Sequence, residues 1–244
     1  MRWERFHYEN RETIVTFLCD RRFLEAGKKS LIRSRTILEN TIRKNPIFRT
    51  TLQPYTCAKR SPCLIRRMCE EGRKVGVGPM ATVAGALAQE SLMAILDAGA
   101  DEAVVDNGGD IAFFIRKPIR VGIYTGNTFI RELAFEVEPR DRPFGICTSS
   151  GTVGHSFSFG KSDAATVISS NVVFADAAAT ALGNRVREES DLESCFDVFK
   201  GLPEIEGAMV VLKNKVALWG TLPRLVRSQF NVDLITRGES SLIQ

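Results

Sequence analysis

The sequence predicts one α+β domain over residues 1–244, with mixed or antiparallel sheets and packed helices. Stretches of alternating, β-branched residues recur along the chain, and segments with helical apolar spacing lie between them. The chain has 244 residues, of which 44% are hydrophobic, so it can bury a sizeable core. No linker or low-complexity tract divides it, and one domain is the simplest interpretation.

The first part of the chain is predicted to form a hairpin followed by helices. The expected elements are a hairpin of Arg5–Tyr8 and Thr13–Cys19, a helix over about Phe23–Lys44, a loop over Phe48–Pro62, and helices over Cys63–Glu71 and Met80–Ala98. Asn45-Pro46 should end the first helix, because the residue before proline disfavours helical backbone. Gly72 and Gly99 should end the other two.

The second part is predicted to be rich in strands. The expected elements are strands at Glu102–Val105, Ile111–Ile115, Ile119–Tyr124, Arg131–Val137, Gly145–Thr148 and Ala165–Ser169, helices over Ala175–Gly183 and Ser190–Phe199, and a hairpin of Ala208–Leu212 with Val216–Trp219. The apolar run Ala208–Leu212 would suit a homodimer formed through a sheet edge, where peptide groups lack partners.

The charge pattern favours no nucleic-acid or membrane partner. The net charge is +4, and basic residues crowd the stretch Arg21–Lys74. A solvated helix face explains this stretch more simply than a nucleic-acid surface, since no nucleic-acid fold signature accompanies it. No apolar run long enough for a bilayer is expected, and the charged N-terminus lacks an export signal. We therefore expect a cytoplasmic protein.

Six cysteines are too few for a disulfide scaffold in a chain of this length, and no CxxC pair occurs. A reducing compartment is implied. The equal spacing of Cys57, Cys63 and Cys69 leaves a sulfur-carrying role open, because thiolates bind soft metals and carry persulfides. Free thiols are the simpler interpretation, since the six-residue gaps match no metal motif.

Two segments rich in small residues carry the candidate site. In the later one, Asp176 and Thr180 are four residues apart in a helix-forming run, so their oxygens project from one face. Such a pair can bind a hard cation. The alternative is structural: Asp176 would cap the start of its own helix, and Thr180 would hydrogen-bond back to a carbonyl.

At this point several motifs resemble those of the ApbE superfamily, which contains metal-dependent FAD:protein FMN transferases and flavin pyrophosphatases. They are Ala84-Gly85, Asn107-Gly108-Gly109-Asp110-Ile111, Thr148-Ser149-Ser150-Gly151, His155 and Ala175-Asp176-Ala177 with Thr180-Ala181. The chain is similar to the UPF0280 branch through Glu12-Thr13-Ile14-Val15, Asn45-Pro46, Phe48 and Val77-Gly78-Pro79-Met80-Ala81. The resemblance implies an ApbE-like, T-fold-related single domain.

The resemblance also implies a set of site residues. Mg²⁺ would be held by Asp176, Thr180 and the backbone carbonyl of Val83, and the nucleotide, FAD or FMN, would be the small-molecule partner. Asp176 and His155 are the candidate catalytic residues. The candidate cofactor-binding residues are Gly85, Gly108, Gly109, Asp110, Thr148 and Ser149, with Gly108 or Gly109 expected at positive φ.

Departures from the family pattern indicate altered chemistry. Ala84 and Gln89 stand where the family has a lysine and an acid, and the loop His155–Gly160 lacks the family's aspartate, proline and arginine. We therefore expect a Mg-dependent flavin- or nucleotide-binding protein, either a diverged flavin transferase or pyrophosphatase or a protein that only binds. The alternative is a non-catalytic accessory protein in anaerobic sulfur handling and homocysteine biosynthesis.

Overall fold

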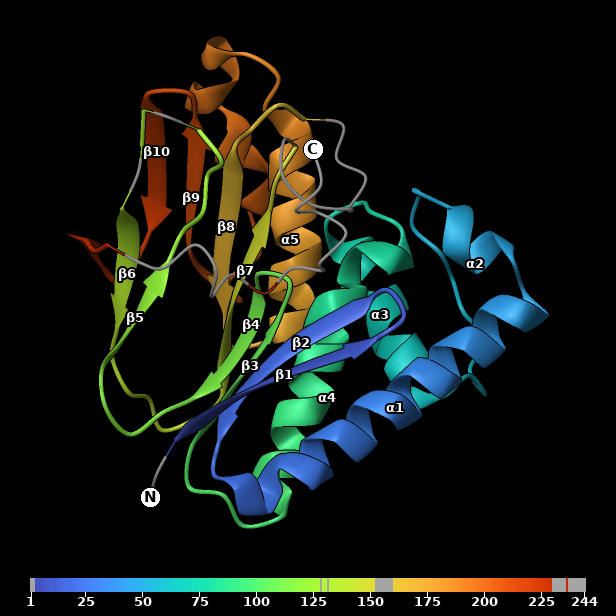
Figure 1. The fold of residues 1–244 in the computed structure, drawn as a ribbon. Coiled ribbons are helices and arrows are strands. Elements are labelled where there is room, and N and C mark those ends of the chain that lie inside the picture. Colours follow the sequence, from blue (N-terminus) through green and yellow to red (C-terminus); the bar gives the residue numbers. More distant parts are fainter. Residues whose placement is uncertain (1–2, 128, 131, 152–159, 230–235, 237–244) are drawn as a thin grey trace.

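An eight-stranded sheet organises the structure, a computed structural model that describes residues 3–127, 129–130, 132–151, 160–229 and 236 (Figure 1). The strand order is β1-β2-β3-β4-β7-β8-β9-β10, and each neighbouring pair is antiparallel. The bounds are β1 Glu4–Asn10, β2 Thr13–Cys19, β3 Ala103–Asn107, β4 Asp110–Phe114, β7 Phe144–Ser149, β8 Ala164–Ser169, β9 Ile205–Leu212 and β10 Lys215–Gly220.

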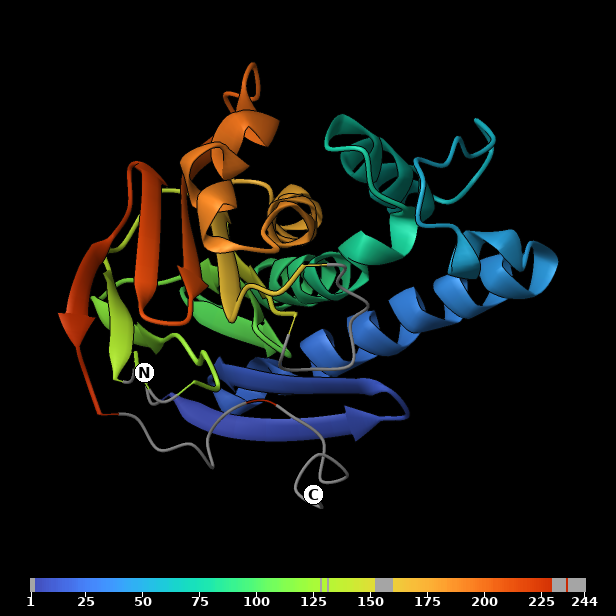
Figure 2. The ribbon, with the colours of Figure 1, turned by 90° about the horizontal axis from the view of Figure 1, so that it is seen from above.

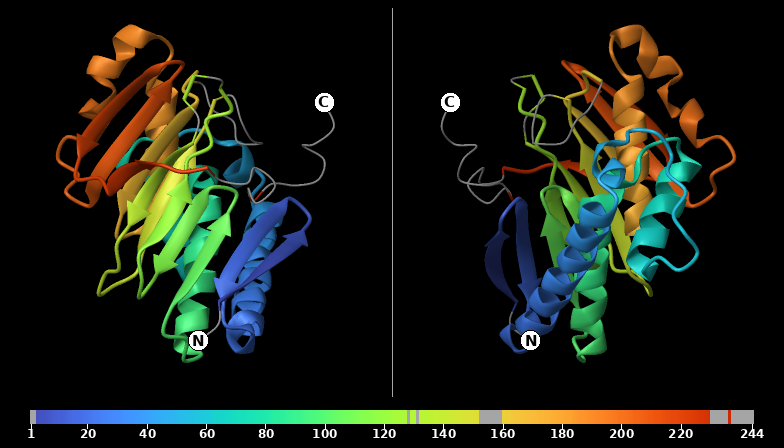
Figure 3. Two further views of the ribbon diagram at one scale, coloured as in Figure 1. Left: turned by 60° about the vertical axis from the view of Figure 1, so that its left-hand side comes forward. Right: turned by 90° about the vertical axis from the view of Figure 1, so that its right-hand side faces the viewer.

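A second, three-stranded sheet and a layer of helices cover the two faces of the large sheet (Figures 2 and 3). The small sheet has the order β11-β6-β5, with β5 Ile119–Gly122, β6 Leu133–Val137 and β11 Arg224–Arg227. The helices are α1 Arg21–Lys44, α2 Ile47–Thr50, α3 Cys63–Lys74, α4 Val83–Asp97 and α5 Val172–Arg185, with 3₁₀ helices at Pro79–Thr82, Glu189–Glu193 and Cys195–Phe199.

Alternation along the strands divides the core into two parts. Val105, Cys147 and Val167 point toward the helices and pack with residues of α4 and α5. Ile146 and Ile168 point the other way, into the cluster shared with the small sheet. Neighbouring side chains of a strand leave its two faces in turn, so one apolar strand supplies both layers.

Most of the predicted elements are confirmed, with shifted ends. Helix α3 continues through Gly72 to Lys74, where we expected Gly72 to end it. The glycine is there for packing: a Cβ on it would lie 3.0 Å from the carbonyl oxygen of Val77. The expected loop after Lys44 contains the short helix α2, and the expected helix Ser190–Phe199 consists of two 3₁₀ helices.

Two further expectations were wrong, and one strand was not predicted. Helix α5 begins at Val172, three residues before the expected start, and β11 was not expected. Ala208–Leu212 lies inside the sheet, between β8 and β10, so it cannot form a sheet edge. The helical stretch Pro79–Asp97 does reach the length and apolarity of a membrane span, although half of its most apolar window is buried inside the fold.

Candidate ligand site at the start of helix α4

Asp176 binds the first turn of helix α4 from the neighbouring helix α5. Its Oδ2 accepts a hydrogen bond from the N–H of Gly85 at 2.8 Å, and the N–H of Ala84 also binds this carboxylate. The opening N–H groups of a helix have no partner within it, and Thr82 at the N-cap of α4 makes no side-chain cap bond. Asp176 therefore serves as the cap of α4.

This contact requires glycine at position 85. A Cβ there would lie 2.7 Å from the carbonyl oxygen of Val172 and 2.8 Å from the Cβ of Asp176. Such distances are shorter than side-chain atoms tolerate, so α4 and α5 approach this closely only because Gly85 has no side chain. Gly85, expected as a cofactor-binding residue, has this structural role.

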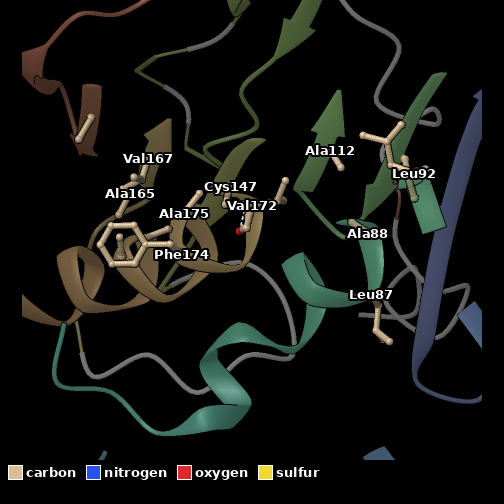
Figure 4. Packing of buried hydrophobic residues seen from close by; sticks show 14 of the residues in the cluster. Leu87, Ala88, Leu92, Ala112, Cys147, Ala165, Val167, Val172, Phe174 and Ala175 are labelled. Carbon is tan, nitrogen blue, oxygen red and sulfur yellow. Dashed lines mark hydrogen bonds between the residues drawn. The ribbon is translucent and has the colours of Figure 1, made fainter. Parts of the chain in front are cut away.

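The start of α5 differs from the expectation. Its N-cap is Asn171, whose side chain accepts from the N–H of Phe174, so Asp176 lies one turn inside the helix and does not cap it. The N–H of Val172 donates to Oε1 of Gln89 on α4 at 3.0 Å. Each helix thus caps the other, and Figure 4 shows Val172 of α5 between Ala175 of the same helix and Ala88 of α4.

The β3–β4 hairpin is tied to the same end of α4. Gly108 and Gly109 form its two-residue turn at φ +68° and +100°, which confirms the expected positive φ. The N–H of Gly109 donates to Oδ1 of Asp106 at 2.9 Å, and Nδ2 of Asn107 donates to the carbonyl oxygen of Ala84 at 3.0 Å. The turn therefore has a fixed place beside the first turn of α4.

A second carboxylate, that of the half-buried Asp110, lies close to Asp176. Asp110 pairs with Cys147 across the β4–β7 ladder, and the side chains of these two residues lie close enough to interact. Burial and the charge of Asp176 raise the pKa of Asp110 well above its usual range. Burial raises the pKa of Asp176 itself to about 7, despite the N–H groups of Gly85 and Ala84.

The cluster is acidic. Burial, followed by the charges of Asp110 and Asp176, raises the pKa of the Cys147 thiol, which donates to the carbonyl oxygen of Val172 at 3.5 Å. Within the described ranges, no lysine or arginine pairs with either carboxylate. A cation placed here would relieve the repulsion between Asp110 and Asp176.

The other predicted residues are dispersed around this centre. Val83 is the first residue of α4, and Thr180 lies one turn beyond Asp176 on α5 and is half-buried. The backbone N–H of Thr148 donates to the carbonyl oxygen of Gly109 at 3.2 Å. The hydroxyl of Thr148 lies on the sheet face opposite to the helices, 3.0 Å from the hydroxyl of Thr166. Ser149 is buried near Gly183, farther along α5. His155 lies outside the described residues.

Three residues of this centre were missed by the sequence reasoning. The sequence predicted no separate role for Asn107 beyond its motif, none for Gln89 beyond its departure from the family pattern, and none for Cys147. The strand register alone brings Cys147 opposite Asp110, and no spacing in the chain indicates it. The motif order did place Asn107 next to the glycine turn.

The cysteines are mostly inaccessible. Cys19, Cys69, Cys147 and Cys195 are buried, Cys57 is half-buried and Cys63 is exposed. Burial raises the pKa of Cys69 to about 12 and that of Cys195 to about 11. A sulfur carrier needs an accessible thiolate, which these buried thiols do not supply.

Comparisons with known proteins agree with this architecture. A family model described as "AbpE bacteria" matches residues 2–195. The chain is 47% identical over 232 residues to a UPF0280 protein of Methanocella arvoryzae, covering 95% of each chain. It is 43% identical over 239 residues to a UPF0280 protein of Archaeoglobus fulgidus, covering 96% of this chain and 99% of that one.

Solved structures show the same fold at low sequence identity. The apo form of the flavinyl transferase ApbE of Pseudomonas stutzeri superposes with a TM-score of 0.57 at 14% identity, covering 89% of this chain and 94% of that one. The ApbE protein of Thermotoga maritima superposes with a TM-score of 0.53 at 12% identity, covering 97% of this chain and 100% of that one.

Proposed function

The chain belongs to the AbpE bacteria family and to its UPF0280 proteins, and on this premise we propose that it binds a flavin-type nucleotide through Mg²⁺ beside the first turn of α4. One observation carries the proposal. Asp176 is buried and Asp110 is half-buried, the two carboxylates lie close enough to repel each other, and within the described residues neither has a cationic side-chain partner. A bound cation would explain why both are tolerated there.

The residues present fit Mg²⁺. This ion prefers oxygen ligands and keeps several waters, so it needs few groups from the protein. A carboxylate has about four lone-pair positions, and Asp176 uses only part of them on Ala84 and Gly85. The hydroxyl of Thr180 and the carbonyl of Val83 would complete the protein's share, and the ion would supply neutralisation of phosphate charge.

The protein's own groups prepare the site in two ways. The mutual caps between α4 and α5 hold Asp176 at a constant position relative to Val83. The Gly108–Gly109 turn presents backbone without side chains, and among the described residues nothing except its neighbours in sequence lies within 4 Å of a Cβ built on Gly108. A flat or phosphorylated ligand can therefore approach this turn at backbone distance.

Binding without FMN transfer is the activity that these residues support. Ala84 and Gln89 stand where the superfamily pattern has a lysine and an acid, and Gln89 is already used as the cap of α5. The site thus lacks a cation and an acid that would act on phosphate. We do not propose the sulfur-handling alternative, because no observation on the described residues favours it, and of the six thiols only that of Cys63 is exposed.

Isothermal titration calorimetry with FAD, FMN and ATP, each with Mg²⁺ and with EDTA, tests the proposal. We expect at least one nucleotide to bind in a Mg-dependent manner, and Asp176→Asn to weaken that binding at least tenfold. Asp97→Asn removes an exposed charge at the far end of α4 and should have no effect. Equal affinity in EDTA, or an unchanged affinity in Asp176→Asn, would refute the metal site.

A further inference from the structure

The two edge strands of the large sheet differ in how well they are protected against pairing with another chain. Edge strand β1 carries charged residues at Glu4, Arg5 and Glu9, and such charges discourage pairing with another chain. Edge strand β10 has one charge, Lys215, at its start, where it pairs with Glu189. The rest of β10 is uncharged, so its outer edge has no such protection.

The edge strand β10 also exposes apolar side chains. Val216 and Leu218 are 42% and 52% exposed, whereas the residues opposite them on β9, Val211 and Met209, are fully buried. The apolar face shared with the small sheet thus extends onto β10 and is left uncovered there by the described residues. Figures 1 and 3 show β10 at the outer end of the sheet.

The other face of β10 is held in place. Trp219 packs against Phe199 and Phe196, with ring centroids 5.7 Å and 6.5 Å apart. This aromatic contact and the full ladder to β9 fix the strand in an extended form. A second strand can therefore add to it without reordering the backbone.

The sequence of β10 is complementary to itself in one register. Opposed residues of an antiparallel pair lie on the same face, so a two-fold axis must pass through a residue position. An axis at Ala217 sets Val216 against Leu218 of the second copy and Lys215 against Trp219. An axis at Leu218 would set Val216 against Gly220 and leave it without an apolar partner.

We propose that the chain forms a two-fold homodimer in which β10 pairs with β10 of a second copy, antiparallel and centred on Ala217. The dimer joins the two large sheets into one. Val216 and Leu218 each gain an apolar cross-strand neighbour, no like charges are opposed, and the small Ala217 avoids a clash at the axis. One strand pair is a small interface, so the dimer is weak and forms only at higher protein concentration.

Site-specific crosslinking tests the register. Opposed Cα atoms in an antiparallel pair are about 4.5–5.5 Å apart, which suits a disulfide. In a Cys63→Ser background, which removes the exposed thiol, Ala217→Cys should give a crosslinked dimer under copper-phenanthroline oxidation. Lys215→Cys is the matched control: its copies would be offset by four residues, roughly 13 Å, and should not crosslink. Equal crosslinking of the two variants would overturn the register.

Sedimentation velocity over a range of concentrations tests the dimer itself. We expect the unmodified chain to dimerise and Leu218→Lys to remain monomeric with a cooperative melting transition. Ile32→Lys changes a comparably exposed apolar residue on α1 and should still dimerise. A monomer at all concentrations, together with no crosslink at Ala217→Cys, would refute the proposal. Crosslinking at Ala217→Cys would support it even if Leu218→Lys failed to fold.

Discussion

Asp176 on α5 accepts the N–H of Gly85 on α4 at 2.8 Å, so the proposed metal ligand is also the cap of a neighbouring helix. The two roles use the same carboxylate but different properties. Capping needs an oxygen acceptor, whereas binding Mg²⁺ needs the negative charge. Substitutions that remove one property and keep the other can therefore separate them.

Asp176→Ala should lower the free energy of unfolding by about 1–2 kcal/mol, because the N–H groups of Ala84 and Gly85 lose their acceptor. Asp176→Asn keeps an amide oxygen at the same place and should cost less. Urea unfolding in EDTA measures both. An equal loss in the two variants would show that the charge, and not the acceptor, stabilises α4.

The stability of the metal-free protein should fall between about pH 4 and pH 7. Burial raises the pKa of Asp176 from its ordinary value of 3.8 to about 7, so in this window the folded state binds more protons than the unfolded state. The stabilisation that comes from protonated Asp176 is fully present below its ordinary pKa of 3.8. It is lost as the pH rises through its folded-state pKa of about 7. Asp110 shifts in the same direction.

Thermal melting at pH 5 and pH 8 in EDTA checks this sign. The difference should be larger for the unmodified protein than for Asp176→Asn, which does not titrate. Saturating Mg²⁺ should raise the melting temperature at pH 8 more than at pH 5, because the ion binds the carboxylate form. A melting temperature that rises from pH 5 to pH 8 only when Asp176 is present would contradict the assignment.

Gly85→Ala should destabilise the protein by about 1–3 kcal/mol, because the new Cβ would overlap the carbonyl of Val172 and the side chain of Asp176. It should also weaken Mg-dependent nucleotide binding by moving Asp176 from its cap. Asp97→Ala, at the exposed end of the same helix, should change stability by less than about 0.5 kcal/mol. Urea unfolding measures the free energy of unfolding of both variants. A similar loss in Gly85→Ala and Asp97→Ala would show that α4 and α5 can move apart to accommodate the new Cβ.

The purified protein should not transfer FMN. Given FAD, Mg²⁺ and a target protein with the usual flavinylation motif, it should give no covalent flavin fluorescence on a denaturing gel. The reason is the loss of a cation at Ala84 and an acid at Gln89, each able to contribute a few kcal/mol to transition-state stabilisation. Fluorescent target that disappears with Asp176→Ala would instead establish a transferase.

The strand and helix order could be predicted from local patterns, but several boundaries could not. Alternation located the hairpins, and Asn45-Pro46 located the end of α1. Gly72 was misread because its cause is distant: it is small to fit the carbonyl of Val77, not to end α3. Ala208–Leu212 was misread as an edge because sheet order depends on β10 and β8 pairing with it.

By itself, the sequence determined the α+β class, the family motifs and the positions of Asp176, Gly85 and the Gly108–Gly109 turn, since these depend on residue type and local spacing. Tertiary structure alone decided that Asp176 caps α4, that Asp110 and Cys147 lie beside it, and that the hydroxyl of Thr148 faces away. These relationships join residues distant in the chain. They are set by strand register and by the close approach of two helices, which no local pattern specifies.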